Sequence, residues 1–161
     1  MANRMPPSAK LLALLIAMSL IAWSIVAWVH IGPWLARRPR RDALLVAMTP
    51  QMFRHIGALA LFPGIGTPPP EWSVPLAWGD GTTAILAMLA MIALQRSWRF
   101  AVTLAWLANL FGVLDLLHNA TKAALLQIAP QLGPIAFVVA FGVPAMLVAH
   151  TLAFRILLRE S

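Results

Sequence analysis

Five hydrophobic stretches, separated by short polar or proline-rich segments, dominate the pattern along the chain. Each stretch approaches or exceeds the roughly 20 residues that an α-helix needs to cross the hydrocarbon core of a bilayer. The pattern therefore predicts an all-α fold, a polytopic transmembrane helical bundle that takes up residues 1–161 as a single domain. The expected spans are residues 11–35, 43–62, 80–95, 99–118 and 134–155.

The second stretch is the least regular of the five, because Pro50, Gln51, Arg54 and His55 interrupt it. Backbone that is not a continuous helix is tolerated at membrane depth only where protein or a water-filled cavity surrounds it. The alternative architecture therefore has four spans plus a re-entrant or interfacial segment.

Two connecting segments carry turn signals. Residues 64–79 contain three consecutive prolines, Pro68–Pro70, which are unsuited to a helix interior. This segment predicts an ordered loop, so that the third span begins near Asp80. Residues 121–132, which include Pro130, predict a short interfacial helix before the last span.

The composition supports a membrane protein: 61% of the residues are hydrophobic and only 11% are charged. A soluble domain of this size could not bury so much apolar surface, whereas a bilayer solvates it. The chain has no cysteine, which excludes disulfides, thiolate metal sites and cysteine nucleophiles. The net charge of +7 comes from basic residues at the ends of the apolar stretches. That placement favours contact with lipid head groups and argues against nucleic acid as a partner.

The distribution of basic residues also predicts an orientation, because cytoplasmic loops are enriched in lysine and arginine. With the amino terminus outside, the cytoplasmic side collects Arg37, Arg38, Arg40, Arg41, Arg96, Arg99, Arg155 and Arg159. The opposite side then holds Arg4, Lys10 and Lys122. We expect a multi-pass protein of the bacterial cytoplasmic (inner) membrane with its carboxyl terminus in the cytoplasm. The four-span alternative would instead place the amino terminus inside.

Polar residues inside the spans are the best indicator of a site, because ionisable groups at that depth are costly and usually face a partner or a cavity. Residues three or four apart share a helix face, and two such faces occur, one on the second span and one on the fourth. Counting helical rise places both in the outer half of the membrane, level with the outer start of the third span. The predicted ligand-binding residues are Gln51, Arg54, His55, Asp80, Asp115, His118 and Asn119.

Two interpretations of these residues do not require catalysis. In the first they form a structural network, in which Asp80 or Asp115 supplies the counter-charge of Arg54 and the amides of Gln51 and Asn119 link helices. In the second they line a pocket that binds or conducts a small solute, with Arg54 holding an anionic group, or that docks a partner subunit. A homo-oligomer or a larger membrane complex fits a bundle of this size. The leading expectation is a non-enzymatic membrane protein.

Two alternatives come from other functional classes. His30 and His150 are each predicted about a turn and a half from the cytoplasmic end of a span, where paired imidazoles would suit haem b in an electron-transfer subunit. His118 and Asp115 would suit the acid–base pair of an intramembrane enzyme, although no nucleophile is evident. The histidine spacing does not predict a zinc site.

Part of the chain resembles small, uncharacterised polytopic proteins of bacterial inner membranes. The resemblance rests on Gln51-Met52-Phe53-Arg54-His55-Ile56-Gly57, on the proline-rich loop ending in Gly79-Asp80, and on Asn109-Leu110-Phe111-Gly112-Val113-Leu114-Asp115-Leu116-Leu117. These segments include Arg54, Asp80 and Asp115 and lie between Gln51 and Leu117, so the first and last spans fall outside. No activity is established for such proteins, and the resemblance implies no catalytic residues.

Overall fold

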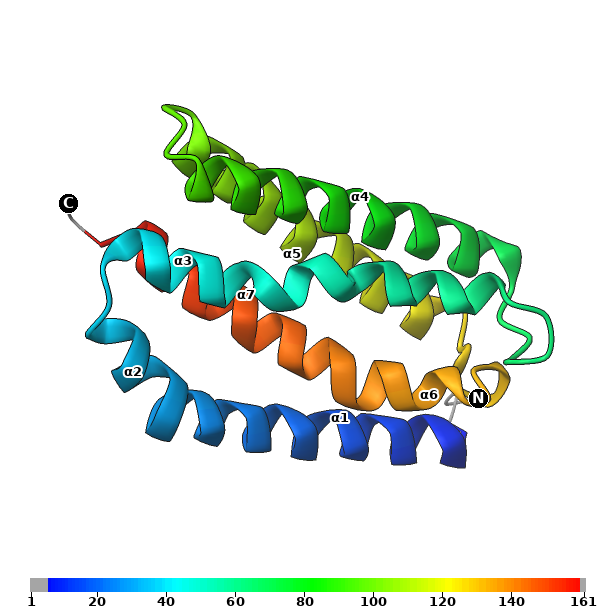
Figure 1. Cartoon of the computed structure of the whole chain (residues 1–161). Helices are drawn as coiled ribbons and strands as arrows, with labels where there is room; N and C mark the ends of the chain where they lie inside the picture. The colour runs from blue at the N-terminus through cyan, green and yellow to red at the C-terminus, as the bar shows by residue number, and fades with distance from the viewer. Residues whose placement is uncertain (1–5, 160–161) are drawn as a thin grey trace.

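The fold is an all-helical bundle of five rods that run side by side (Figure 1). The structure, a computed structural model, describes residues 6–159. The first rod consists of α1 (Pro7–Val26), a π-helical turn (Ala27–Ile31) and α2 (Gly32–Ala36). The second begins as α3 (Arg40–Met48) and continues as a 3₁₀ helix, η2 (Thr49–Leu61). The third and fourth are the long helices α4 (Pro70–Gln95) and α5 (Ala101–Leu125).

The last rod follows a 3₁₀ turn at Ala129–Gln131. It consists of α6 (Ile135–Phe137), a π-helical segment (Val138–Gly142) and α7 (Val143–Leu157). By length and composition all five rods could cross a membrane: Pro7–Ala36, Arg40–Leu61, Pro70–Gln95, Ala101–Leu125 and Ile135–Leu157. The predicted all-α class and the five apolar helices are therefore confirmed.

The third rod begins earlier than expected, and the predicted loop over residues 64–79 is wrong for its second half. Pro70 is the first residue of α4 and Pro69 is its N-cap. The first turn of a helix has no use for the N–H that proline lacks, so the proline run ends the loop and starts the helix. Asp80 therefore lies about 15 Å along α4, well inside the rod, and not at its outer start.

The predicted interfacial helix over residues 121–132 is also wrong. Helix α5 continues to Leu125, and the chain then turns at Gln127, whose φ of 49° is left-handed. Only the single 3₁₀ turn at Ala129–Gln131 precedes the last rod. The fourth rod is thus longer than expected and carries Asn119 inside the bundle.

Small side chains allow the second to fifth rods to pack closely at one end of the bundle. The core there is built on buried alanines together with Leu44, Met48, Leu94 and Ile156. Such small residues let helix backbones approach, as is usual where helices pack in membranes. The alanines are Ala43, Ala47, Ala87, Ala90, Ala93, Ala101, Ala105, Ala108 and Ala153. A second core at the other end contains Trp72, Leu76, Ile128, Leu132 and Ile135.

Helix α1 lies along one side of the bundle, next to the last rod (Figure 1). Its contacts are with α7, the π-helical segment before α7, and the 3₁₀ turn at Ala129–Gln131. None of the residues of α1 is buried. The first rod therefore enters the core only near its end, where Leu35 of α2 is buried.

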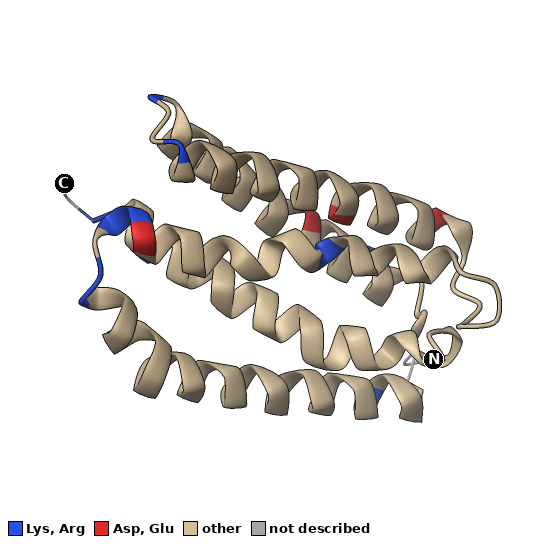
Figure 2. Cartoon of the chain, viewed as in Figure 1, with Lys and Arg blue, Asp and Glu red and all other residues tan. Residues whose placement is uncertain are grey.

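Arginines gather at the end of the bundle where α2 meets α3, α4 meets α5, and α7 ends (Figure 2). Arg40 donates a hydrogen bond of 2.6 Å to the carbonyl of Leu157, and Arg41 one of 2.6 Å to that of Gln95. Arg159 donates one of 3.2 Å to the carbonyl of Leu35. These carbonyls close the last turns of α7, α4 and α2, where helices leave acceptors unpaired and carry partial negative charge. The arginines thus stabilise three helix ends at one end of the bundle.

Candidate functional site

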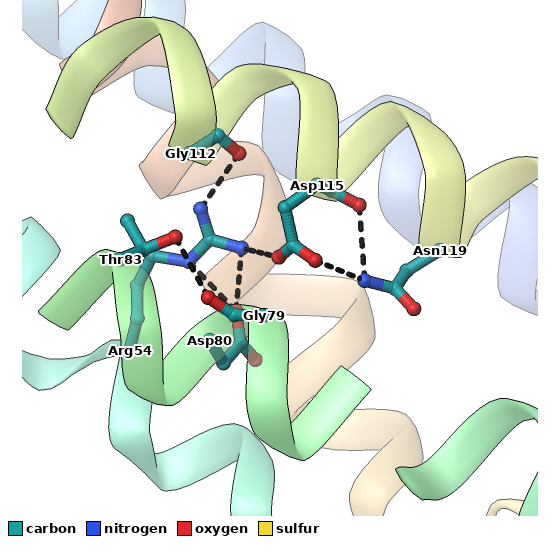
Figure 3. Close-up of polar contacts among 7 residues, drawn as sticks. All are labelled: Arg54, Gly79, Asp80, Thr83, Gly112, Asp115 and Asn119. Atoms are coloured by element: carbon teal, nitrogen blue, oxygen red, sulfur yellow. Dashed lines mark hydrogen bonds and ion pairs between the residues drawn. The ribbon is translucent and has the colours of Figure 1, made fainter. Parts of the chain in front are cut away.

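Arg54 is buried in the bundle with both predicted acidic partners (Figure 3). Its Nε donates to Asp80 Oδ1 at 2.7 Å, and its Nη2 lies 2.5 Å from the same oxygen. Nη2 also donates to Asp115 Oδ2 at 2.5 Å, and Nη1 donates to the carbonyl of Gly112 at 2.7 Å. The guanidinium therefore joins η2, α4 and α5, and each of its three nitrogens is engaged.

The 3₁₀ geometry of η2 explains which of its residues face inward. A 3₁₀ helix has three residues per turn, so residues i and i+3 are aligned. Gln51, Arg54 and Ala60 are buried, and Gly57 lies against Asp80. His55 was predicted to share a face with Gln51, four residues earlier, by α-helical spacing, but with three residues per turn it is rotated about 120° from Gln51 and is exposed. Its Nδ1 is paired with the carbonyl of Met52 at 2.9 Å.

Glycines make room for the two carboxylates. A Cβ at Gly79 would overlap Asp115 Oδ1, and one at Gly57 would overlap Asp80 Oδ2. A Cβ at Gly112 would lie 2.9 Å from Arg54 Nη1 and would also strike His150 and Thr83. Any larger residue at these positions would push a carboxylate or the guanidinium out of place, so the three glycines are part of the site.

Asn119 completes the group, which we name the Arg54 cluster (Arg54, Asp80, Asp115 and Asn119). Its Nδ2 donates to Asp115 Oδ1 at 2.8 Å and to the Asp115 carbonyl at 3.0 Å. Trp72 Nε1 donates to the backbone carbonyl of Asn119 at 3.0 Å. In the opposite amide orientation the Asn119 Oδ1 would face the two acceptor oxygens of Asp115. The amide is therefore oriented with Nδ2 toward Asp115 and Oδ1 away from it (Figure 3). Within residues 6–159 that Oδ1 has no hydrogen-bond partner.

A cavity of about 500 Å³, which we name the α1 cavity, lies between α1 and the rest of the bundle beside this cluster. Asp80 and Asn119 contribute to its wall, and the exposed Gln127 is the other polar side chain in the lining. The remaining walls are apolar and come from α1, η2, α4, α5 and the last rod, including Ala13, Ile16, Ile56, Leu76, Leu116, Ile135 and Val139. The cavity is therefore apolar except where Asp80, Asn119 and Gln127 line it.

The structure brings four of the seven predicted site residues together as the Arg54 cluster. Gln51 is buried, but within residues 6–159 neither atom of its amide has a partner. His118 is exposed on α5. The expectation that Gln51 and Asn119 link helices through their amides is not met, because Asn119 lies one turn after Asp115 and bonds within its own helix.

The two histidines of the haem alternative lie in different surroundings. His30 is exposed on the π-helical turn of the first rod. His150 is buried, with its Nδ1 2.7 Å from Asn109 Oδ1, and its ring contacts the position of Gly112 beside Arg54. In the part of the chain that the structure describes, no group of three or more histidines, cysteines and acidic residues could hold a metal ion.

Some residues of this region were not predicted from the sequence. The predicted loop over residues 64–79 includes Trp72 and Gly79, which lie inside α4. The pairing of Asn109 with His150 was not predicted. One signal in the sequence could have indicated them. Glycine lowers the stability of a helix, so a glycine inside a long apolar helix indicates close packing at that position.

Comparisons with known proteins identify a family without assigning an activity. No curated protein matches the chain, and no solved structure does. A family model described as a domain of unknown function, DUF8737, matches residues 11–158. The match includes the first and last rods, which lie outside the segments that carried the resemblance noted from the sequence. The chain therefore belongs to the DUF8737 family.

Proposed function

We propose that this chain is a non-enzymatic protein of a bacterial cytoplasmic membrane that binds a small, largely apolar solute in the α1 cavity. The observation that carries the proposal is an apolar cavity that meets two buried polar side chains, Asp80 and Asn119. Its volume of about 500 Å³ is in the range of roughly 300–1,000 Å³ that small-molecule sites occupy. Few polar groups in a mostly apolar lining are also typical of such sites.

The residues of the Arg54 cluster have different proposed roles. Arg54 has each nitrogen engaged, so it does not suit the expected role of binding an anionic ligand. Its role is to hold Asp80 and Asp115 in place and to join three rods. Asp80 and Asn119 are then the groups that would contact the solute, because both contribute to the cavity wall.

The exposure of α1 supports a lateral entry route. Helix α1 supplies Ala9, Leu12, Ala13 and Ile16 to the cavity wall, yet none of its residues is buried. Movement of this rod would open the cavity without disturbing the Arg54 cluster, which lies on η2, α4 and α5. A solute dissolved in the bilayer would then enter from the lipid phase.

The proposed orientation places the arginine-rich end in the cytoplasm and the α1 cavity in the outer half of the membrane. The absence of native cysteine makes a direct test simple. Ser97 and Thr67 are exposed and lie in the connections at opposite ends of α4. In intact cells, a membrane-impermeant maleimide should label Thr67→Cys and should label Ser97→Cys only after the membrane is opened. The reverse pattern would contradict the orientation.

Filling the cavity should abolish solute binding. Ala13 lines the cavity, whereas Ala22 is exposed on α1 outside it, and nine residues of helix place the two on opposite faces. Protein in phosphatidylcholine nanodiscs should bind the compact neutral probe 1-adamantanol, measured by calorimetry after subtraction of empty nanodiscs. We expect Ala13→Trp to lose this binding and Ala22→Trp to retain it. Equal binding by both variants would refute the proposed function.

A further inference from the structure

The charges of the Arg54 cluster do not balance. One guanidinium is paired with two carboxylates, so the cluster carries one negative charge in excess when both carboxylates are ionised. Within residues 6–159, Arg54 is the only basic residue in an ion pair with either of them. An uncompensated charge in a low-dielectric interior is costly, so a further cation would be attracted to it.

Two residues that line the cavity, Asp80 and Asn119, each have a side-chain oxygen that Arg54 does not use. Arg54 binds Oδ1 of Asp80, while Oδ2 of the same carboxylate lies beside Gly57, another residue of the cavity wall. Asn119 is 4% exposed and its Oδ1 has no partner among the described residues. The indole N–H of Trp72 is already used by the Asn119 carbonyl. A solute that satisfied these groups would therefore have to donate hydrogen bonds.

We propose that the solute of the α1 cavity is a protonated amine carried on a compact apolar body. The ammonium supplies both the missing positive charge and the N–H donors for Asp80 Oδ2 and Asn119 Oδ1. The apolar body occupies the chamber between α1 and the last rod. This inference rests on the proposed function, since it names the chemical class of the solute that the cavity binds.

A series of probes with one hydrocarbon cage separates charge from hydrogen bonding. The probes are 1-adamantanamine, its N,N,N-trimethyl derivative, 1-adamantanol and 1-adamantanecarboxylate, each titrated into the protein in phosphatidylcholine nanodiscs. We expect the amine to bind about tenfold more tightly than the alcohol, because hydrogen bonds to charged groups are the stronger ones. The trimethyl cation, which donates no hydrogen bond, should lose about tenfold relative to the amine, and the carboxylate should not bind.

Asp80→Asn tests the assigned residue without removing the acceptor that Arg54 uses, because the asparagine oxygen still accepts from Nε. In this variant the amine should lose its advantage over the alcohol, so the ratio of the two affinities is the quantity compared with the unchanged protein. The thermal unfolding temperature shows that the variant is folded. If the variant does not fold, the probe series on the unchanged protein still shows whether the cavity prefers an amine.

The results distinguish failure of this inference from failure of the proposed function. If alcohol and amine bind equally well, the cavity is a solute site but the solute is not an amine. If neither binds, both proposals fall.

A primary ammonium could come from a free amine or from a lipid head group. Competition when phosphatidylethanolamine is added to the nanodiscs identifies the lipid as the source, and unchanged amine binding identifies a free amine.

Discussion

Replacement of Arg54 by methionine is expected to lower the free energy of unfolding by about 3–5 kcal/mol, because it leaves the buried carboxylate of Asp80 and the partly buried carboxylate of Asp115 without their partner. The side chain of Arg54 is 2% exposed, and its guanidinium joins η2 to α4 and α5. The stability of Arg54→Lys should fall between those of the unchanged protein and Arg54→Met, since lysine keeps the charge but lacks the planar guanidinium that reaches several acceptors. Denaturation followed by circular dichroism in detergent measures the effect.

The neighbouring residue provides a matched control. His55 follows Arg54 in the same 3₁₀ helix but is exposed, and its ring is paired only with the local carbonyl of Met52. His55→Met should therefore change the stability by no more than about 0.5 kcal/mol. If Arg54→Met were as stable as His55→Met, the ion pairs would not hold the rods together, and the assigned structural role would be wrong.

Two glycines in α4 are expected to respond in opposite directions to the same substitution. A Cβ at Gly79 would overlap the Asp115 carboxylate, whereas nothing lies within 4 Å of a Cβ at Gly81. Gly79→Ala should cost about 1–3 kcal/mol, because the carboxylate must move away from Arg54 and Asn119. Gly81→Ala should be neutral or add up to about 1 kcal/mol, since alanine favours a helix more than glycine does.

The same denaturation experiment compares the two variants directly. Both replace glycine by alanine within one turn of one helix, so the gain in helix propensity is shared and only the contact with Asp115 differs. Equal stabilisation by both substitutions would show that α4 and α5 do not approach at Gly79 as closely as the structure has them.

The helical class and the five apolar rods were predictable because hydropathy over a span of helix is a strong signal. The start of α4 was not, because Pro70 can end a loop or begin a helix and the local sequence does not distinguish the two. Because residues 64–79 were predicted to form a loop, Asp80 was placed at the end of the third rod instead of well inside it.

The association of Arg54 with Asp80 and Asp115 was predictable from the cost of isolated charge at membrane depth. The place of His55 was not, because the prediction used α-helical spacing where the chain forms a 3₁₀ helix. In such a helix Gln51, Arg54, Gly57 and Ala60 share a face at intervals of three, and His55 is turned away. Hydropathy alone does not separate these two helix types.

The α1 cavity was beyond sequence reasoning, because it depends on how α1 packs against the other rods. A stretch as uniformly apolar as residues 11–35 has no polar face that would show which side contacts protein. The side-chain oxygen of Asn119, which has no hydrogen-bond partner within residues 6–159, is likewise identified only once its amide nitrogen is placed against Asp115. These two features carry the functional proposal.

The most direct test of solute binding in the α1 cavity is contact between the bound probe and the alanines that line it. Protein labelled at alanine methyl groups, in nanodiscs with 1-adamantanamine, should give nuclear Overhauser effects from the cage to Ala13 and Ala123, which line the cavity. Ala22, outside the cavity on the opposite face of α1, should give none. Contacts to Ala22 without contacts to Ala13 and Ala123 would place the probe in lipid and contradict the proposed function.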